Sequence, residues 1–203
     1  MSTLLILGAG GHGRVVADAA VASGAWTRVI ASDRDPGRCT GELLPGVALM
    51  PLDQALGLAG AVHVAIGQAA AREREVKSLP AGKLASVVHP RASVSAHAQV
   101  APGCFIAAQA VVAPRAVLGA SVIVNHGAVV DHDVEVGDYS HVAPLTALGG
   151  AARIGRAVLV GSGTNVLPGK RVRDGIVIGS GAAVVDDLAE PGVYAGVPAR
   201  RIK

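Results

Sequence analysis

The chain has 203 residues, enough for one or two domains. Hydrophobic residues make up 51% of it and charged residues 16%, a balance that indicates a compact fold and excludes an intrinsically disordered chain. The net charge of +3 is small and no Lys/Arg block with interleaved aromatic residues occurs, so nothing indicates a nucleic-acid partner. No apolar run has the length of a membrane span, and the apolar residues 1–8 lack the basic start of a signal peptide. We therefore expect no membrane partner and a cytoplasmic protein.

The first element is an apolar run over residues 3–7, which has the pattern of a buried parallel strand. The sequence Gly-Ala-Gly-Gly-His-Gly follows over residues 8–13, and residues 14–22 have a helical pattern. The glycines have the G-x-G-x-x-G spacing in the strand-to-helix context that this motif requires. Glycines let the backbone turn tightly and present amides at a helix N-terminus, where a phosphate can bind. The loop predicts a phosphate-containing ligand; the alternative is a tight turn with no ligand.

The rest of the first domain alternates strands and helices. A second strand over residues 29–31 leads to Ser32 and Asp33, and Asp33 has the place after the glycine loop from which a carboxylate can bond a ribose hydroxyl. The pattern predicts helices over residues 52–58 and 69–77 and strands over residues 62–66 and 84–88. This βαβαβ unit is half of a dinucleotide fold, which favours a nucleotide or a nucleotide sugar over NAD.

Two polar side chains of this domain have two interpretations each. His12 lies inside the glycine loop and either contacts a ligand or faces solvent at the start of the helix. Arg72 follows Gly67, at the end of the third strand, and either reaches a phosphate or lies on an exposed helix face. His89-Pro90 marks the end of the domain, because the residue before a proline is restricted to extended backbone.

Beyond this junction, an aliphatic residue returns at every sixth position. A period of six fits neither a helix nor an ordinary strand, so it indicates a repeat architecture. The sixteen positions are Val94, Val100, Ile106, Val112, Leu118, Val124, Val130, Val136, Val142, Leu148, Ile154, Val160, Val166, Val172, Ile178 and Val184. A second register of small or short-branched residues comes four positions later and is broken only by Lys170: Ala98, Cys104, Ala110, Ala116, Val122, Ala128, Val134, Ser140, Thr146, Ala152, Val158, Thr164, Ile176 and Ala182.

These registers predict a triangular solenoid of parallel strands. Three hexads close one turn, so residues 18 apart stack directly, and the repeat makes roughly five turns. The narrow interior leaves no room for rings, and aromatic residues are indeed only 2% of the chain. Burial of the aliphatic register falls short of the entropy lost on ordering the backbone, so we expect contacts between subunits and hence an oligomer. Cys39 and Cys104 form no metal or disulfide pattern, and Cys104 has the place of a packing residue.

Three histidines of the repeat are candidates for chemistry. His132 is the strongest, because it stands outside both inward registers and between Asp131 and Asp133. A neighbouring carboxylate favours the imidazolium that forms when a general base accepts a proton. The alternative is a solvated histidine at a corner. His126 lies one face before His132, so these two can converge only across a subunit boundary, and His141 taken alone is no more than a surface histidine.

Several motifs together point to one family. They are the glycine loop, Ile66-Gly67, His89-Pro90, the stretch from residue 125 to residue 141, and the closing Gly-Val-Pro-Ala-Arg of residues 196–200. Over almost the whole chain they resemble the bacterial nucleotide-sugar acetyltransferases of the left-handed β-helix (hexapeptide) superfamily, in the group of sialic acid O-acetyltransferases and UDP-4-amino-sugar N-acetyltransferases. The resemblance implies a small α/β nucleotide-sugar-binding domain over residues 1–88, a left-handed parallel β-helix over residues 89–188, and a C-terminal tail over residues 189–203.

The resemblance also implies roles for particular residues. His132 matches the general base, and Asp133 matches the acid that raises its basicity. Four positions match contacts to acetyl-CoA: His141 and the backbone near Gly150, Ser162 and Ser180. Six positions match the nucleotide-sugar site: Gly10, Gly11, His12, Ser32, Asp33 and Gly67. The chain departs from many relatives at residues 68–70, where Gln-Ala-Ala replaces a pattern with Asn or Asp.

The expected activity is acetyl transfer from acetyl-CoA to the amino group of a nucleotide-linked amino sugar, without a metal, in a homotrimer whose site lies between adjacent coils. Three alternatives stay open. One is O-acetylation of a sialic-acid-type sugar. Another is a zinc-dependent lyase of the carbonic-anhydrase kind, with His126, His132 and His141 as ligands. The last is a non-catalytic nucleotide-sugar sensor or scaffold. The sequence specifies neither the sugar nor its nucleotide carrier.

Overall fold

The chain divides into two compact units between Pro90 and Arg91, as seen in the computed structural model, which describes residues 3–203. This division lies two residues beyond the boundary expected from the sequence. The second unit runs to Lys203, so residues 189–203, expected as a separate tail, are part of it. Among residues 3–203, none of the helices combines the length and apolar character that a membrane span requires.

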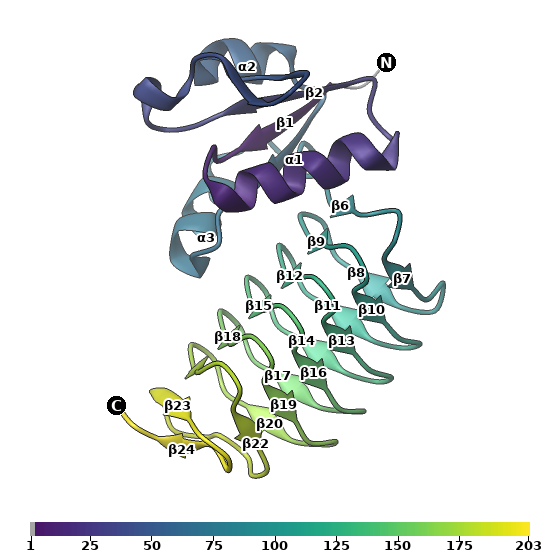
Figure 1. The fold of residues 1–203 in the computed structure, drawn as a ribbon, viewed down its shortest axis with the longest axis vertical. Coiled ribbons are helices and arrows are strands. Elements are labelled where there is room, and N and C mark those ends of the chain that lie inside the picture. The colour runs from purple at the N-terminus through teal and green to yellow at the C-terminus, as the bar shows by residue number, and fades with distance from the viewer. Residues whose placement is uncertain (1–2) are drawn as a thin grey trace. The chain divides into compact units, whose positions relative to one another are not determined.

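The first unit is built on a parallel sheet with the strand order β2–β1–β5 (Figure 1). The central strand is the most apolar, and its residues Leu4 to Leu7 are at most 2% exposed, so they form the core of this unit. The predicted alternation of strands and helices is confirmed. The bounds are β1 (Thr3–Leu7), α1 (Gly11–Ser23), β2 (Arg28–Ser32), α2 (Leu52–Leu58), β5 (Ala61–Val64) and α3 (Ala69–Lys77).

The glycine loop is tighter than the sequence suggested, because α1 begins at Gly11 rather than at residue 14. A Cβ on Gly13 would overlap the carbonyl oxygen of Gly8, so this close approach accepts only glycine. Gly8 has φ 121° and lies against the carbonyl oxygen of Ala65, which a Cβ would approach to 2.8 Å. The loop is therefore packed against the end of β5.

Some elements of the first unit differ from the prediction. A 3-10 turn at Pro36–Arg38 and a hairpin of β3 (Glu42–Leu44) and β4 (Val47–Ala48) lie between β2 and α2. The strand expected over residues 84–88 is reduced to β6 (Val87–Val88) and a single bridge from Leu84 to Val62. Short turns of this kind have no periodicity from which they can be predicted.

The second unit contains sixteen two-residue strands within residues 91–184, and each ends on a residue of the predicted aliphatic register. They are β7 (Ser93–Val94), β8 (Gln99–Val100), β9 (Phe105–Ile106), β10 (Val111–Val112), β11 (Val117–Leu118), β12 (Ile123–Val124), β13 (Val129–Val130), β14 (Glu135–Val136), β15 (His141–Val142), β16 (Ala147–Leu148), β17 (Arg153–Ile154), β18 (Leu159–Val160), β19 (Asn165–Val166), β20 (Arg171–Val172), β21 (Val177–Ile178) and β22 (Ala183–Val184).

The strands stack every third one, so they form three parallel sheets. Val112 pairs with Val130, and Val130 pairs with Leu148, which confirms that residues 18 apart stack. Sheet I contains β7, β10, β13, β16, β19 and β22; sheet II contains β8, β11, β14, β17 and β20; and sheet III contains β9, β12, β15, β18 and β21. The small register is buried between them, and Ala110, Ala128 and Ala152 are each 0% exposed. The unit is the left-handed parallel β-helix that the resemblance implied.

The corners of the solenoid share one backbone conformation. From residue 103 to residue 181, every sixth residue has a positive φ. Six of the fourteen are Gly, and the other eight are Gln109, Arg115, Ser121, Asp133, Tyr139, Leu145, Ala151 and Ala157. This left-handed conformation is uncommon outside glycine, so the stacked coils must hold it in place.

Residues beyond β22 continue the solenoid. Strand β23 (Val193–Ala195) pairs in parallel with β21, and β24 (Arg200–Arg201) pairs antiparallel with β23. Tyr194 is 7% exposed and its hydroxyl donates to the carbonyl oxygen of Glu190 at 2.8 Å. This hairpin extends sheet III, so the backbone amides at β21 are paired rather than left at an open edge.

Leu118 and Val117 test the inward register, because they are neighbours on β11 and face opposite sides, with exposures of 1% and 36%. We expect Leu118→Ala to lower the free energy of unfolding of the solenoid by about 2–5 kcal/mol. Val117→Ala should cost about 0.5 kcal/mol or less. Denaturant unfolding followed by circular dichroism measures both, and equal losses would contradict the assignment of the two faces.

Candidate active site

The strongest site candidate lies at the corner that follows β13. His132 Nδ1 donates to Asp133 Oδ2 at 2.9 Å. Asp133 has φ 58°, and this left-handed turn lets its carboxylate reach the ring of the residue just before it. Asp adopts this conformation more often than most residues other than glycine. The sequence alone did not reveal that the corner conformation brings the pair together.

The neighbouring coils hold this corner on both sides. The Asp133 amide donates to the carbonyl oxygen of Pro114 at 3.2 Å, and the His132 carbonyl oxygen accepts from the Ala151 amide at 2.9 Å. The His132 amide donates to Asp131 Oδ1 at 2.7 Å. The backbone under the imidazole is therefore tied to the coil before it, to the coil after it and to its own neighbour.

The electrostatics of the pair suit a base. The hydrogen bond to Asp133, followed by the charge of Asp131, raises the pKa of His132 above its ordinary 6.5. The same hydrogen bond holds the pKa of Asp133 below its ordinary value. Since Nδ1 donates to a carboxylate, the neutral ring carries its proton there and Nε2 is an acceptor. The His132 side chain is 61% exposed, so the ring is accessible from solvent.

Gly150 lies beside this acceptor nitrogen. It belongs to the next coil, at the position that stacks on His132, and a Cβ on it would lie 2.5 Å from His132 Nε2. Any side chain at position 150 would therefore displace the ring. Gly150 matched an acetyl-CoA contact in the sequence, and the structure places it against the candidate base.

The other residues expected at the cofactor lie elsewhere on the solenoid. His141 is on β15 in sheet III, and its Nε2 is 3.1 Å from Asn125 Nδ2. Ser162 and Ser180 are exposed and lie in adjacent coils, since the Gly181 amide donates to the Ser162 carbonyl oxygen at 2.8 Å. A single chain does not bring these residues to the His132 corner.

The histidines do not form a metal centre within one chain. Over residues 3–203, no group of three or more His, Cys, Asp and Glu side chains is placed to hold a metal ion. His126 is exposed at the corner after β12, and its amide donates to Asn125 Oδ1 at 2.9 Å.

Within the first unit, the glycine loop is shaped by Asp33. Its Oδ2 accepts from the Ala9 amide at 2.8 Å and its Oδ1 accepts from the Asp35 amide at 3.0 Å. Gly11 and Gly67 are exposed, and a Cβ on Gly10 or Gly11 would meet no atom within 4 Å. The loop is thus open along these glycines and has room for a ligand.

Ser32 and Arg72 point inward rather than to the surface. Ser32 is 0% exposed, and its Oγ lies 3.7 Å from Cys39 Sγ. Arg72 is 1% exposed, and its Nη1 donates to the carbonyl oxygens of Ile66 and Gly67 at 2.7 and 2.8 Å. The interpretation of Arg72 as an exposed side chain is therefore wrong, and its guanidinium is engaged with the turn that ends at Gly67.

Sequence reasoning missed Arg115. Its Nε lies 2.8 Å from Asp133 Oδ1, on the oxygen that His132 does not use. The signal was present, because residue 115 stands 18 positions before residue 133 and the stacking rule places the two in adjacent coils.

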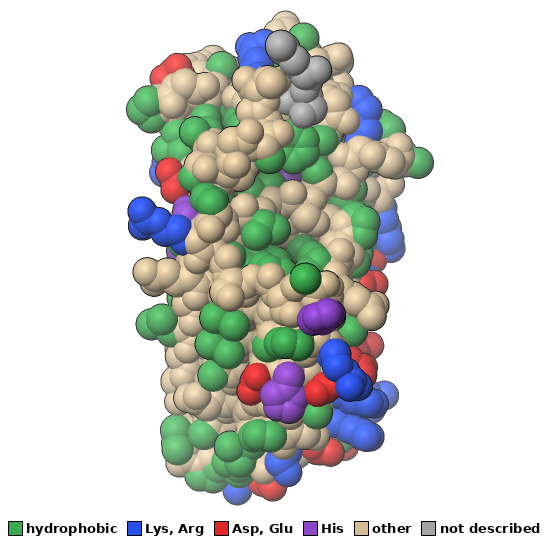
Figure 2. Space-filling view, turned by 90° about the vertical axis from the view of Figure 1, so that its right-hand side faces the viewer, with side chains coloured by type: hydrophobic (Ala, Val, Ile, Leu, Met, Phe, Trp, Pro, Cys, Tyr) green, Lys and Arg blue, Asp and Glu red, His purple; other side chains and the backbone are tan. Residues whose placement is uncertain are grey.

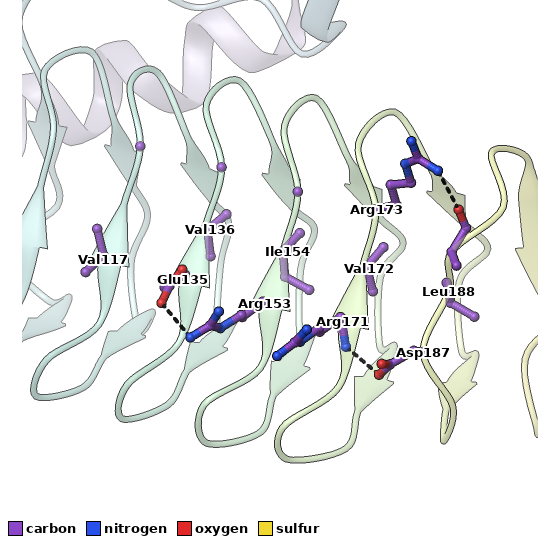
Figure 3. A pocket seen from close by; sticks show the side chains of 14 residues that line it. Val117, Glu135, Val136, Arg153, Ile154, Arg171, Val172, Arg173, Asp187 and Leu188 are labelled. Atoms are coloured by element: carbon purple, nitrogen blue, oxygen red, sulfur yellow. Dashed lines mark hydrogen bonds and ion pairs between the residues drawn. The ribbon is translucent and has the colours of Figure 1, made fainter.

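The outer face of sheet II also carries charged side chains. Figure 2 shows a face of the molecule on which one exposed histidine side chain lies between acidic side chains, with basic side chains beside them. Across sheet II, Glu135 and Arg153 point toward one another at 3.4 Å, and the Arg171 amide donates to Asp187 at 2.9 Å (Figure 3). These residues line a pocket of about 660 Å³.

A smaller pocket lies at the side of the His132–Asp133 pair. It has a volume of about 380 Å³ and is lined by Arg115, Asp133, Glu135 and their neighbours in adjacent coils. Asp133 and its ion-pair partner Arg115 both border this pocket.

A small α/β unit followed by a left-handed β-helix with an exposed His–Asp pair defines a hexapeptide-repeat acyltransferase. Residues 3–79 match the model of the PglD N-terminal domain family. The chain is similar to the acetyltransferase domain of PglB from Neisseria gonorrhoeae, with 32% identity, coverage of 100% of both chains and a TM-score of 0.92. That domain has also been solved in complex with acetyl coenzyme A, with a TM-score of 0.92 and 99% coverage of both chains.

A second relative is a histidine-to-alanine mutant of GDP-perosamine N-acetyltransferase from Caulobacter crescentus, solved with CoA and GDP-perosamine. It has 30% identity, a TM-score of 0.92, and coverage of 100% of this chain and 98% of that one. The chain belongs to the PglD-like nucleotide-sugar acetyltransferases of the hexapeptide superfamily.

The raised pKa of His132 can be tested directly. Because the hydrogen bond to Asp133 is its largest cause, we expect the wild-type ring to titrate above 6.5 and Asp133→Asn to bring the midpoint down toward that value. Asp131→Asn should lower it less, since Asp131 acts through its charge. NMR titration of the His132 ring measures all three midpoints. A wild-type midpoint at or below 6.5 would contradict the pairing.

Proposed function

We propose that the protein transfers the acetyl group of acetyl-CoA to the amino group of a nucleotide-linked amino sugar, with His132 as the general base. The observation that carries this proposal is the 2.9 Å hydrogen bond from His132 Nδ1 to Asp133, which leaves Nε2 as an acceptor in an exposed ring. The choice of an amine is supported by the N-acetyltransferase with GDP-perosamine that is 30% identical to this chain.

In the proposed mechanism, the sugar amine attacks the carbonyl carbon of the thioester and His132 Nε2 takes the proton that the nitrogen loses. The negative charge of Asp133 stabilises the imidazolium. The hydrogen bond between His132 and Asp133 also holds the ring in its orientation. Backbone amides of the coils stabilise the tetrahedral oxyanion, at about 3–4 kcal/mol for each donor. Collapse of this intermediate forms the amide and releases the CoA thiolate, which recovers a proton from His132.

We further propose that the site is shared between subunits of a homotrimer. His132 lies at a corner between sheets I and II, whereas His141 lies on sheet III, so one chain cannot present both to one acetyl group. The outward residues Val111 and Val129 of sheet I are apolar, and Leu145, at the corner between sheets III and I, is 72% exposed. Packing of these surfaces between copies would remove apolar area from water and bring His132 of one protomer to His141 of the next.

The nucleotide part of the acceptor is assigned to the first unit. The open glycines at positions 10, 11 and 67 present backbone to a ligand, and His12 lies at the start of α1 beside them. Asp33 shapes the loop through the Ala9 amide. Ser32 contributes through its backbone, because its carbonyl oxygen accepts from the Gly8 amide at 2.8 Å while its side chain is buried.

Replacement of His132 tests the base. His132→Asn should lower turnover by about 100-fold or more, since a positioned base contributes roughly 10²–10⁴-fold. Affinity for CoA should change little, because the ring acts on the acceptor amine. Thiol release from acetyl-CoA, measured against a panel of 4-amino nucleotide sugars and sialic acid, gives the turnover, and calorimetry gives the affinity. Unchanged turnover would remove His132 from the mechanism.

Mixed oligomers test the shared site. His132→Asn and His141→Ala should each have low activity as pure proteins. In randomly mixed trimers made by co-expression, about a quarter of the sites combine an intact His132 with an intact His141 from a neighbour, so activity should recover to about a quarter of the wild-type value. Mass spectrometry of the intact assemblies verifies mixing. Mixed trimers as inactive as their parents would place the site within one chain.

A further inference from the structure

The two oxygens of the Asp133 carboxylate have different partners. Oδ2 accepts from His132 Nδ1 at 2.9 Å, and Oδ1 accepts from Arg115 Nε at 2.8 Å. The last side-chain torsion of Asp is broad, so a hydrogen bond to one oxygen alone leaves the plane of the carboxylate loosely defined. With both oxygens held, the plane of the group is defined and the oxygen that faces the imidazole cannot turn away.

The backbone brings Arg115 to this place. Arg115 has the corner position one coil before Asp133, and the two residues share the left-handed conformation with φ 64° and 58°. The Asp133 amide donates to Pro114, the neighbour of Arg115, and the Arg115 amide donates to the His97 carbonyl oxygen at 3.1 Å. The ladder between coils thus fixes both ends of the ion pair.

Stability does not account for this contact. The side chain of Arg115 is 79% exposed and that of Asp133 is 36% exposed. Exposed ion pairs contribute about 0–1 kcal/mol at most, because water screens them. Within the described residues, no other carboxylate contacts the Arg115 guanidinium, so its visible effect is on the carboxylate that it shares with His132.

We propose that Arg115 is a positioning residue of the catalytic pair, whose guanidinium holds the Asp133 carboxylate in the orientation that bonds His132 Nδ1. This role rests on the proposed function of His132 as the base. Arg115 does not touch the reacting atoms, and it acts through Asp133.

Two effects of Arg115 on His132 have opposite signs, which makes the proposal testable. The charged groups that face the ring are Asp131, Asp133 and Arg115. The charge of Arg115 by itself lowers the pKa of His132, whereas the hydrogen bond that His132 donates to Asp133 raises it most. If Arg115 acted only through its charge, its removal would raise the pKa of His132. If Arg115 orients the Asp133 carboxylate, its removal would lower that pKa.

The experiment compares Arg115→Gln, Arg115→Lys and the control Arg153→Gln. Arg153 is a matched control because it pairs with Glu135 at 3.4 Å across exposed side chains and does not touch the His–Asp pair. We expect Arg115→Gln to lower the NMR titration midpoint of His132. It should also lower kcat about tenfold, because part of the contribution of the general base is lost, and leave both KM values unchanged. Arg115→Lys should restore part of both, and Arg153→Gln should change neither.

A midpoint that rises or stays unchanged in Arg115→Gln would overturn the proposal, as would an equal fall in Arg153→Gln. The titration is made on the 203-residue chain without substrates, so its result does not depend on the proposed function. If His132→Asn kept its activity, the base assignment would fail, while the titration would still decide whether Arg115 orients Asp133. Circular dichroism of each variant verifies that the solenoid is folded.

Discussion

The stacking of one coil on the next is the constraint on which this molecule depends. Two-residue strands are too short to be stable alone, and they persist because each pairs with the equivalent strands of the coils before and after it. The same ladder holds left-handed corners at residues other than glycine, such as Arg115 and Asp133. The corners are therefore rigid points on which side chains can be placed with precision.

The candidate active site uses this rigidity. The backbone of His132 and Asp133 is hydrogen-bonded to the coils on both sides. The imidazole is held by the carboxylate next to it, and its Nε2 lies against Gly150, where a side chain would not fit. These contacts leave Nε2 as the ring nitrogen that can accept a proton. An exposed ring would otherwise sample several orientations, so preorganisation by the corner is what distinguishes it from an ordinary surface histidine.

The first unit is also shaped by a small number of contacts. Its glycine loop is narrow because Gly13 touches Gly8, and it is held by the Ala9 amide, which donates to the Asp33 carboxylate. Arg72 holds the turn at Ile66 and Gly67 from inside the fold. The surface left for a ligand is mainly backbone, which suits a phosphate-bearing group more than a particular base. This explains why the sequence of the loop does not specify the nucleotide.

The sequence by itself determined the solenoid, its registers, the stacking of every third hexad, and the main strands and helices of the first unit. The period of six can be recognised in the sequence because every hexad places the same kind of side chain inward. The sequence also singled out His132 and Asp133, because a histidine next to an aspartate is suited to act as a general base. The tertiary structure alone decided which groups complete the site. Arg115 reaches Asp133 from another coil, Gly150 faces Nε2 from a third, and Arg72 turns inward to two carbonyl groups. Such contacts depend on side-chain direction and corner conformation, which the order of residues along the chain does not record.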